Sequence, residues 1–406
     1  MPPRHAIVIA VDGLRASALG AYGNTWHPTP ALDRLASESL LFDWMMVDSP
    51  ALAGFYRAAW LGAPAPHDGV EPTNLKPLAA THPAGLLPQL LAAGVAASLT
   101  TDDLWLAEQG DQLGFRDVRA LEFPQPATAE SMADTELAQL FAIAADQLEQ
   151  WSVAEDSATA GAEPPRLLWL HARGYHGAWD APLELRQSLL DEDDPEAPTF
   201  VTPPLRLETT NLDELLLQRA AYAAQTAILD ECVGMLIDML AETGLADSTA
   251  VLIIGCRGFA LGEHGAAGSE VRDLYGEVTH IPCLLRRPDG APTAPPRASE
   301  LRQPADLAPY LLEWFGCPLP PSPGDVSQSP IARERVATIG MHGEIALRTQ
   351  NWLLRQTAKS SELSETEPTI ELFAKPDDRW EANEIADRCP EEVAELLAEV
   401  AQYIGA

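Results

Sequence analysis

The chain has 406 residues, of which 46% are hydrophobic and 21% charged, which is enough apolar sequence to bury a sizeable core. Asp and Glu number 60 against 26 Lys and Arg, so the formal net charge of -34 would repel phosphate backbones and anionic lipid headgroups. We therefore expect neither a nucleic-acid partner nor a membrane partner.

The cysteines and the N-terminus indicate the compartment. Five cysteines are dispersed without a CxxC pair, which disfavours both a disulfide framework and a zinc site. The first apolar run, residues 6–11, has only six residues and is shorter than the hydrophobic region of a secretory signal peptide. No stretch approaches the roughly 20 apolar residues of a membrane-spanning helix. We expect a soluble protein of the cytoplasm.

The periodicity of apolar residues predicts alternating strands and helices. Aliphatic runs bounded by turn residues predict buried strands at residues 6–11, 95–100, 167–171, 250–254 and 281–285. Helical spacing predicts helices at residues 31–39, 85–93, 131–151 and 212–242, the last with Asn211 as N-cap and Gly244 after its end. Such alternation indicates an α/β fold with a large, mainly parallel sheet covered on both faces. Ligands bind these sheets at the carboxyl ends of the strands.

The chain is predicted to divide into two units. Residues 155–165 are predicted to form a surface loop, and the Pro-rich residues 318–330 a linker. Beyond the linker, residues 336–356 and 369–373 suggest a small antiparallel sheet, and residues 390–403 a helix that should pack on the main domain. We therefore predict a main α/β domain at residues 1–330 and a small α+β subdomain at residues 331–406.

Longer motifs occur along nearly the whole chain. In order, they are IVIAVDGLRASALGAYGNTWHPTPALDRLASESLLF, LLWLHARGYHGAWDAP, STAVLIIGCRGFALGEHG, LYGEVTHIPCLLRRP and IELFAKPDDRWEANEIAD. Together they resemble the motifs of the sulfatase family, which belongs to the alkaline-phosphatase superfamily. The resemblance implies that family's sandwich fold: a large, mainly parallel central sheet flanked by helices, plus a small C-terminal antiparallel sheet with a helix.

The resemblance implies a specific nucleophile. Sulfatases oxidise a Cys or Ser in the pattern C/S-x-P-x-R to formylglycine, whose hydrated aldehyde attacks sulfur. The matching stretch is SPALAGFYRAAWLG, and aligning the arginine with Arg57 places Ala53 at the nucleophile position. Alanine has no atom that can attack, so this covalent catalysis is unavailable. Ser49 is an alternative nucleophile, but we favour its interpretation as a turn serine before Pro50.

The metal site implied by the resemblance is also altered. Sulfatases hold Ca²⁺ or a similar divalent ion with two Asp after the first strand and an Asp-Asn or Asp-His pair after a later strand. The matching positions here are Asp12, Gly13, Cys256 and Arg257. Three of these four side chains lack the carboxylate that a hard cation prefers. We expect no cofactor, with Ca²⁺ or a similar ion only if the chain is active, and we predict an Asp12–Arg257 ion pair in its place.

Other positions implied by the resemblance are partly retained. Arg57 and His176 are candidates for binding an anion, although Arg57 is equally well explained as a buried structural cation. Ser269 stands where the family has a lysine, and Asp102 and Asp103 occupy the region of an expected Lys-x-His element. The GEHG loop around His264 mainly shapes the pocket in the family, so we assign it no catalytic role.

The tryptophans offer a weaker signal. Trp60, Trp151, Trp179 and Trp380 could together stack on a carbohydrate. They are dispersed along the sequence, however, and packing in the core explains them at least as well.

Three functions remain open. The preferred hypothesis is a catalytically inactive pseudo-sulfatase with a binding or regulatory role, whose partner is a sulfated or phosphorylated ligand or an active sulfatase paralogue. The alternative is a divergent hydrolase of sulfuric or phosphoric esters that uses a nonstandard nucleophile such as Ser49, without the charge stabilisation of a divalent ion. The third is a phosphodiesterase or phosphonate hydrolase of the same superfamily, but Cys256 and Arg257 remove part of its metal ligands too.

Overall fold

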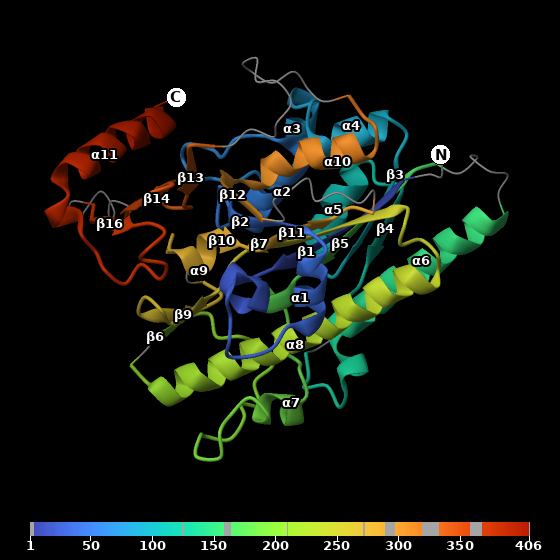
Figure 1. Cartoon of the computed structure of the whole chain (residues 1–406), viewed down its shortest axis with the longest axis horizontal. Helices are drawn as coiled ribbons and strands as arrows, with labels where there is room; N and C mark the ends of the chain where they lie inside the picture. Colours follow the sequence, from blue (N-terminus) through green and yellow to red (C-terminus); the bar gives the residue numbers. More distant parts are fainter. Residues whose placement is uncertain are drawn as a thin grey trace.

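A large mixed sheet forms the centre of the molecule (Figure 1). The computed structural model describes residues 4–123, 126–157, 164–208, 210–270, 273–288, 297–318, 333–357 and 368–405. In these residues the sheet has nine strands in the order β10-β2-β11-β7-β1-β5-β3-β4, with β12 paired to β2. The strands are β1 His5–Asp12, β2 Leu40–Met46, β3 Ala96–Thr101, β4 Asp117–Ala120, β5 Arg166–Ala172, β7 Thr249–Arg257, β10 His280–Ile281, β11 Cys283–Arg286 and β12 Arg297–Arg302.

The strands that carry the strongest apolar runs lie at the middle of this sheet. β1 pairs in parallel with β5 on one side and β7 on the other, and β3 extends the parallel array beyond β5. The strands β1, β5 and β7 are almost wholly buried, as expected for a parallel sheet covered on both faces. The register places Asp12, the last residue of β1, beside Arg257, the last residue of β7.

Helices cover both faces of the sheet (Figure 1). Alternate residues of β1 point to opposite faces, so Ile7 and Ile9 join one hydrophobic core and Ala6 and Val8 join the other. The first core is closed by α1 Pro30–Ser37, α6 Glu136–Ser157 and α8 Leu212–Glu242. The second is closed by α2 Leu52–Leu61, α4 Leu86–Ala92, α5 Leu104–Leu113 and α10 Ala308–Trp314. The predicted α/β sandwich is confirmed.

Smaller elements connect these layers. The short helices are α3 Lys76–Thr81, α7 Leu183–Gln187 and α9 Gly276–Thr279, with 3₁₀ turns η1 Ala16–Ala18, η2 Gly20–Tyr22, η3 Met132–Asp134, η4 Gly174–His176, η5 Pro304–Leu307 and η6 Ala386–Arg388. A minor sheet contains β6 Leu207–Glu208, β8 Ala260–Leu261 and β9 Ala266–Gly268. No helix in the described ranges combines the length and apolarity needed to cross a bilayer.

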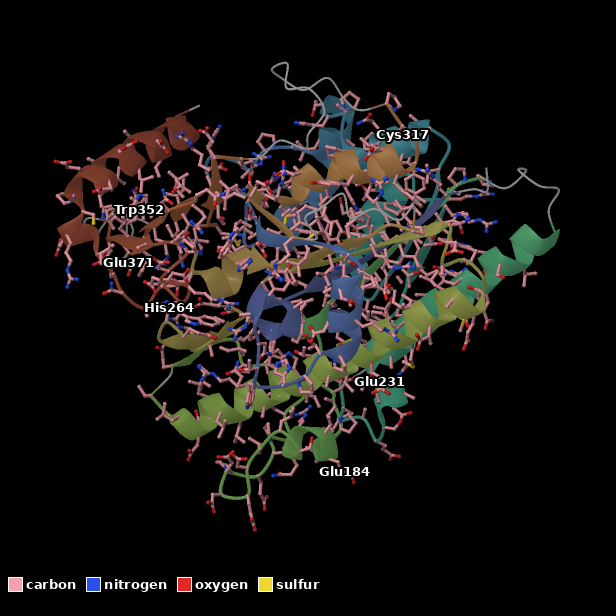
Figure 2. All side chains as sticks on the ribbon, in the orientation of Figure 1. Glu184, Glu231, His264, Cys317, Trp352 and Glu371 are labelled. Atoms are coloured by element: carbon pink, nitrogen blue, oxygen red, sulfur yellow. The ribbon has the colours of Figure 1, made fainter. Side chains whose placement is uncertain are left out.

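The predicted C-terminal antiparallel sheet is present. Its strands, in sequence order and in spatial order, are β13 Arg335–Ile339, β14 Ile345–Thr349, β15 Trp352–Gln356 and β16 Ile370–Ala374. The final helix, α11 Pro390–Gly405, buries Leu396 and Val400 against Ile345 and Leu347 of this sheet. Our expectation that the helix packs on the main domain is therefore wrong: its apolar stripe covers the C-terminal sheet, at the edge of the molecule (Figures 1 and 2).

Some predicted helix bounds agree with the structure, and others differ from it for identifiable reasons. The longest helix has the predicted bounds, and the side chain of its N-cap, Asn211, accepts hydrogen bonds from two backbone N–H groups. The helix predicted at residues 131–151 begins only at Glu136, because residues 132–134 form the separate turn η3. The helix also includes residues 155–157, where the sequence predicts a loop. Residues 158–163 of that predicted loop lie outside the described residues. Residues 319–330 of the predicted linker lie outside them too.

Candidate functional site

The candidate site lies where the central parallel strands end. Asp12 ends β1, Arg257 ends β7, and Asp102 and Asp103 follow β3. His176 lies in η4, beyond the end of β5. Because parallel strands present their carboxyl ends at one edge of the sheet, residues far apart in the sequence converge here.

Asp12 and Arg257 form a two-pronged ion pair. Arg257 Nε donates to Asp12 Oδ1 at 2.8 Å, and Arg257 Nη2 donates to Asp12 Oδ2 at 2.9 Å. Arg257 Nη1 also donates to the backbone oxygen of Pro50 at 3.1 Å, which ties β7 to the loop before α2. Asp12 is only 2% exposed, so both carboxylate oxygens are satisfied away from water. The predicted ion pair is confirmed.

The charges around Asp12 keep it ionised. Burial alone would raise the pKa of this carboxyl, but the guanidinium of Arg257 and the ring of His176 outweigh burial and lower the pKa to about 2. His176 Nε2 lies 4.0 Å from Asp12 Oδ1. The pair is therefore a fixed carboxylate facing a fixed guanidinium at neutral pH.

Gly13 leaves no room for a second carboxylate. Its φ is +80°, a conformation that side-chain-bearing residues rarely adopt. A Cβ built at Gly13 would lie 2.7 Å from Cβ of Tyr175, closer than real Cβ atoms approach. Tyr175 stacks on Tyr222 with ring centroids 4.0 Å apart, and the Tyr222 hydroxyl donates to the backbone oxygen of Gly13 at 2.9 Å. Two tyrosines thus close the space beside Asp12.

A buried polar cluster lies next to this ion pair, and the sequence did not reveal it. The hydroxyl of Tyr56 lies 2.8 Å from Nδ1 of His171, and Sγ of Cys256 lies 3.8 Å from the same nitrogen. Burial lowers the pKa of His171 to about 4 and raises the pKa of the Cys256 thiol well above its usual value. Both groups are therefore neutral, and the cluster offers an imidazole and a thiol in place of carboxylates.

Ala53 occupies the position that the resemblance gives to the nucleophile. It lies in the first turn of α2, directly after the loop that receives the hydrogen bond from Arg257. Ser49 precedes it in that loop and is 1% exposed; its hydroxyl accepts a hydrogen bond from Ala51 N–H at 3.3 Å. This local bond is typical of a turn serine. The geometry favours that interpretation of Ser49 over a nucleophile.

Arg57 lies in α2 with its guanidinium among carboxylates. Arg57 Nη2 donates to Asp48 Oδ2 at 2.7 Å, and Nε donates to Glu71 Oε2 at 2.9 Å. Nη1 donates to the backbone oxygen of Ala63, and Arg57 is 1% exposed. These contacts use the guanidinium to hold the β2–α2 loop and residues 63–71 together. They favour the structural interpretation of Arg57, whose partners Asp48 and Glu71 had no recognisable motif.

His176 and Ser269 line one cavity of about 450 Å³, which we call the His176 cavity. Arg173, Asp102 and Glu136 line it as well. Asp102 Oδ1 accepts a hydrogen bond from the backbone N–H of Arg173 at 2.7 Å. Burial raises the pKa of Asp102 to about 7, although the Arg173 N–H and guanidinium oppose this shift. The cavity therefore combines donors from Arg173 and His176 with a carboxyl group that titrates near neutrality.

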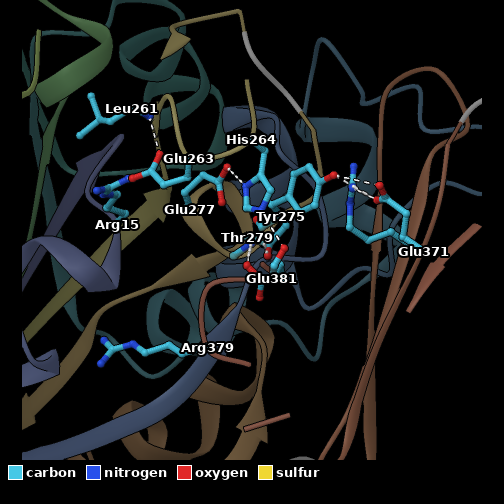
Figure 3. Close-up of polar contacts among 12 residues, drawn as sticks. Arg15, Leu261, Glu263, His264, Tyr275, Glu277, Thr279, Glu371, Arg379 and Glu381 are labelled. Atoms are coloured by element: carbon cyan, nitrogen blue, oxygen red, sulfur yellow. Dashed lines mark hydrogen bonds and ion pairs between the residues drawn. The ribbon is translucent and has the colours of Figure 1, made fainter. Parts of the chain in front are cut away.

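The GEHG loop contributes to a junction rather than to the strand-end site (Figures 2 and 3). His264 Nδ1 lies 2.7 Å from Glu277 Oε1, and its Nε2 lies 3.2 Å from the backbone oxygen of Glu381. The His264 ring stacks on Tyr275 at 3.5 Å between centroids. In the described residues, these His and Glu groups form the cluster whose ligand atoms are close enough for a metal, but Lys375 already pairs with the Glu381 carboxylate. The cluster joins the main domain to the C-terminal residues.

Removing one partner of the Asp12–Arg257 pair should be costly. Arg257→Met leaves a buried, uncompensated carboxylate and should destabilise the fold by about 3–5 kcal/mol in urea unfolding near pH 7. The double variant Asp12→Leu/Arg257→Met should recover most of this loss, because it buries neither charge. If the double variant were as unstable as Arg257→Met, packing rather than charge would explain the effect.

The same pair predicts a pH dependence. The folded pKa of Asp12 lies below the value of the unfolded chain, so the pair's stabilisation is complete above about pH 4 and is lost as pH falls towards 2. The unfolded chains titrate alike, and without Arg257 burial raises the pKa of Asp12, so the stability gap between the native chain and Arg257→Met should narrow as pH falls from neutrality towards 2. Chemical unfolding at a series of acid pH values measures this gap, and a constant gap would contradict the assignment.

Asp102 predicts the opposite dependence of folding stability on pH. Its folded pKa is raised to about 7, so the folded state binds a proton that the unfolded state has lost, and this group's contribution to stability falls as pH rises from about 4 to 7. Asp102→Asn keeps the acceptor for Arg173 N–H and removes the charge. Its thermal midpoint should exceed that of the native chain increasingly up to about pH 7 and by a constant amount above it. Asp111→Asn, an exposed change on α5, is the control and should leave the native profile unchanged.

A sequence model of the sulfatase family matches residues 4–317. The N-acetylglucosamine-6-O-sulfatase of Bacteroides thetaiotaomicron is 31% identical over 110 residues, which are 27% of this chain and 19% of that protein. The choline-sulfatase of Rhizobium meliloti is 29% identical over 177 residues, 40% of this chain and 34% of that protein. The matches thus span at most about a third of these relatives' length.

Solved structures agree on the fold. A 2-O GAG sulfatase superposes with a TM-score of 0.71 over 100% of this chain and 92% of its own, at 17% identity. The phosphonate monoester hydrolase of Agrobacterium radiobacter superposes with a TM-score of 0.69 at 15% identity, covering 98% of this chain and 96% of its own. At such identities the likeness establishes the fold alone. Because the family match covers most of the chain and the fold agrees, the protein belongs to the sulfatase family.

Proposed function

We propose that this chain is a catalytically inactive sulfatase-family protein that acts by binding. The observation that carries the proposal is the position of the Arg257 guanidinium, which lies on both oxygens of Asp12 and donates to Pro50, just before Ala53. In an active sulfatase, the matching positions supply the metal ligands and the attacking oxygen. Here a fixed cation and a methyl group stand at those positions.

The donor set does not fit a hard divalent ion. Both oxygens of Asp12 already accept hydrogen bonds from a guanidinium, which would repel a metal. Cys256 contributes a thiol that burial keeps protonated, and Gly13 has no space for a carboxylate beside Tyr175. We therefore propose that the chain needs no metal cofactor, and we derive no chemical step through Ca²⁺ or a similar ion.

The His176 cavity supports an oxyanion ligand that also carries hydroxyl groups. Arg173 and His176 supply donors to the lining, and Asp102 and Glu136 supply carboxyl groups. A sulfated or phosphorylated sugar offers both kinds of group, and an active sulfatase paralogue remains a second candidate partner. The names of the relatives, an N-acetylglucosamine-6-O-sulfatase and a choline-sulfatase, are consistent with a sulfated ligand.

Two further proposals concern the chain as a whole. We retain the division into a main domain at residues 1–330 and a C-terminal subdomain at residues 331–406, because β13 to β16 and α11 share a hydrophobic core of their own. We also retain a cytoplasmic location: all five cysteines are free thiols, four of them buried, as a reducing compartment would maintain them.

The alternative function is a divergent ester hydrolase. It would require Ser49 to act as a nucleophile without a divalent ion to stabilise the developing charge, a contribution of several kcal/mol in metal-dependent enzymes. Ser49 is buried, and its hydroxyl is engaged with the backbone of Ala51. Among the residues that the structure describes, the Ser49 hydroxyl is bonded to no general base, so this function ranks second.

A combined metal and activity assay tests the proposal. The purified chain should show no turnover of 4-nitrophenyl sulfate, 4-nitrophenyl phosphate or bis(4-nitrophenyl) phosphate above buffer, with Ca²⁺, Mg²⁺ or Mn²⁺ or without them. Elemental analysis after dialysis against each metal should find no stoichiometric ion. Arg257→Asn should also remain inactive, because it removes the guanidinium without supplying a nucleophile.

The controls separate the two candidate functions. Ser49→Ala should behave as the native chain does, and a mock purification from cells without the protein measures contaminating hydrolases. Turnover above the mock purification, with or without added metal, that disappears in Ser49→Ala would overturn the proposal in favour of the divergent hydrolase.

A further inference from the structure

A second cavity, distinct from the His176 cavity, is lined by two exposed tryptophans. It has a volume of about 530 Å³, and Trp26 and Trp380 both line it, although 354 positions separate them in the sequence. Their exposures are 50% and 53%, whereas Trp60, Trp151 and Trp179 are buried in the core. The core explanation therefore holds for three of the four tryptophans that we considered as a set, but not for Trp380. Two large aromatic rings left in water around one cavity indicate a binding surface.

Both rings are held in place before any ligand arrives. The backbone N–H of Trp26 donates to Asn24 Oδ1 at 2.9 Å, and its ring packs edge-on against His27 at 5.7 Å between centroids. The guanidinium of Arg379 lies 4.9 Å from the Trp380 ring centroid and donates to the backbone oxygen of Tyr22. A rigid aromatic wall loses little conformational entropy on binding.

The charges on the lining favour an anion. Arg15 is paired with Glu263, so these two charges balance. Arg219 donates through Nε to the backbone oxygen of Leu261 at 2.9 Å, and its two terminal nitrogens make no hydrogen bond or ion pair with a described residue. The lining therefore has one uncompensated guanidinium in a chain whose net charge is -34.

His27 adds no charge to the lining. Asn24 Oδ1 accepts from Trp26 N–H, and Asn24 Nδ2 donates to the backbone oxygen of Ala18, which fixes the orientation of the amide. The same Nδ2 donates to His27 Nε2 at 2.8 Å, so the proton of the neutral ring is on Nδ1. Burial and the charge of Arg15 lower the pKa of His27 to about 4, which keeps the ring neutral.

We propose that this Trp26–Trp380 cavity binds a small, ring-bearing oxyanion. The ring would stack on Trp26 and Trp380, and its carboxylate, sulfate or phosphate group would accept hydrogen bonds from the terminal nitrogens of Arg219. The volume suits a ligand of one or two rings. The cavity shares no lining residue with the His176 cavity. Its test measures binding rather than turnover, so the result does not depend on the proposed loss of catalysis.

Calorimetric titration at low salt with four probes tests the site. Glucuronate is a sugar acid, benzoate an aryl acid, glucose a neutral ring, and inorganic sulfate a charge without a ring. Glucuronate or benzoate should bind at least about tenfold more tightly than glucose and sulfate, because only they combine a ring with an oxyanion. Whichever of the two binds more tightly identifies the source of the ring as a sugar or an aryl acid.

Variants assign the binding to this cavity. Trp26→Ala and Trp380→Ala should each weaken the ring-bearing anions about tenfold, and Arg219→Gln should reduce them to the affinity of glucose. Arg34→Gln and Leu212→Ala make the same kinds of change at exposed positions outside the cavity and should have no effect. The proposal is overturned if no probe binds up to about 10 mM, or if binding is unchanged in Trp26→Ala and Arg219→Gln.

Discussion

The structure depends on how one buried carboxylate is neutralised. Asp12 ends the central strand of a parallel sheet, where burial would otherwise make its charge very costly. A divalent ion held by several carboxylates solves this problem in one way, and a single guanidinium solves it in another. With Arg257 present, one positive and one negative charge balance, and any further carboxylate would leave excess negative charge in the same low-dielectric space. The absence of a carboxylate at Gly13 and at Cys256 is therefore consistent with the guanidinium of Arg257 beside Asp12.

The surrounding packing makes this solution rigid. Tyr175 and Tyr222 stack against Gly13, and Tyr175 Oη shares a hydrogen bond with Thr226 of α8 at 2.9 Å. The longest helix is thus tied to the end of β1 through two aromatic rings. As a result, the space beside Asp12 is filled on the Gly13 side, while the side beyond His176 opens into a cavity. His176 lines this cavity, whereas Asp12 does not.

The sequence was informative where a strong local pattern coincided with a position at a strand end. The apolar runs predicted β1 and β7, and the resemblance to sulfatases placed Asp12 and Arg257 in one pocket after these strands, so the two together predicted the ion pair. By contrast, β2 and β12 were missed, because Asp43 interrupts the apolar run of β2 and the first half of β12 alternates exposed and half-buried residues. His171 was also missed, because it continues an apolar strand run and its role comes only from Tyr56 and Cys256 across the fold.

Long-range contacts were the least predictable. Glu71 joins Arg57 from a segment without regular structure, and no periodicity marks it. The helix α11 has a clear apolar stripe, but a stripe does not specify which surface it covers, and we chose the wrong one. Trp26 and Trp380 line one cavity only because the folded chain brings the C-terminal segment next to the loop after η2.

The junction between the two parts of the chain explains how Trp380 is placed. Both ring nitrogens of His264 face acceptors, the Glu277 carboxylate and the Glu381 carbonyl, which favours the protonated ring. Burial opposes this, but the hydrogen bond and charge of Glu277 raise the pKa of His264. Lys375 pairs with the Glu381 carboxylate in the same cluster, so the segment that carries Glu381 is held by this ion pair as well as by His264. Since Glu381 is the next residue after Trp380, the charge balance at the junction and the geometry of the aromatic cavity are set by the same short segment of backbone.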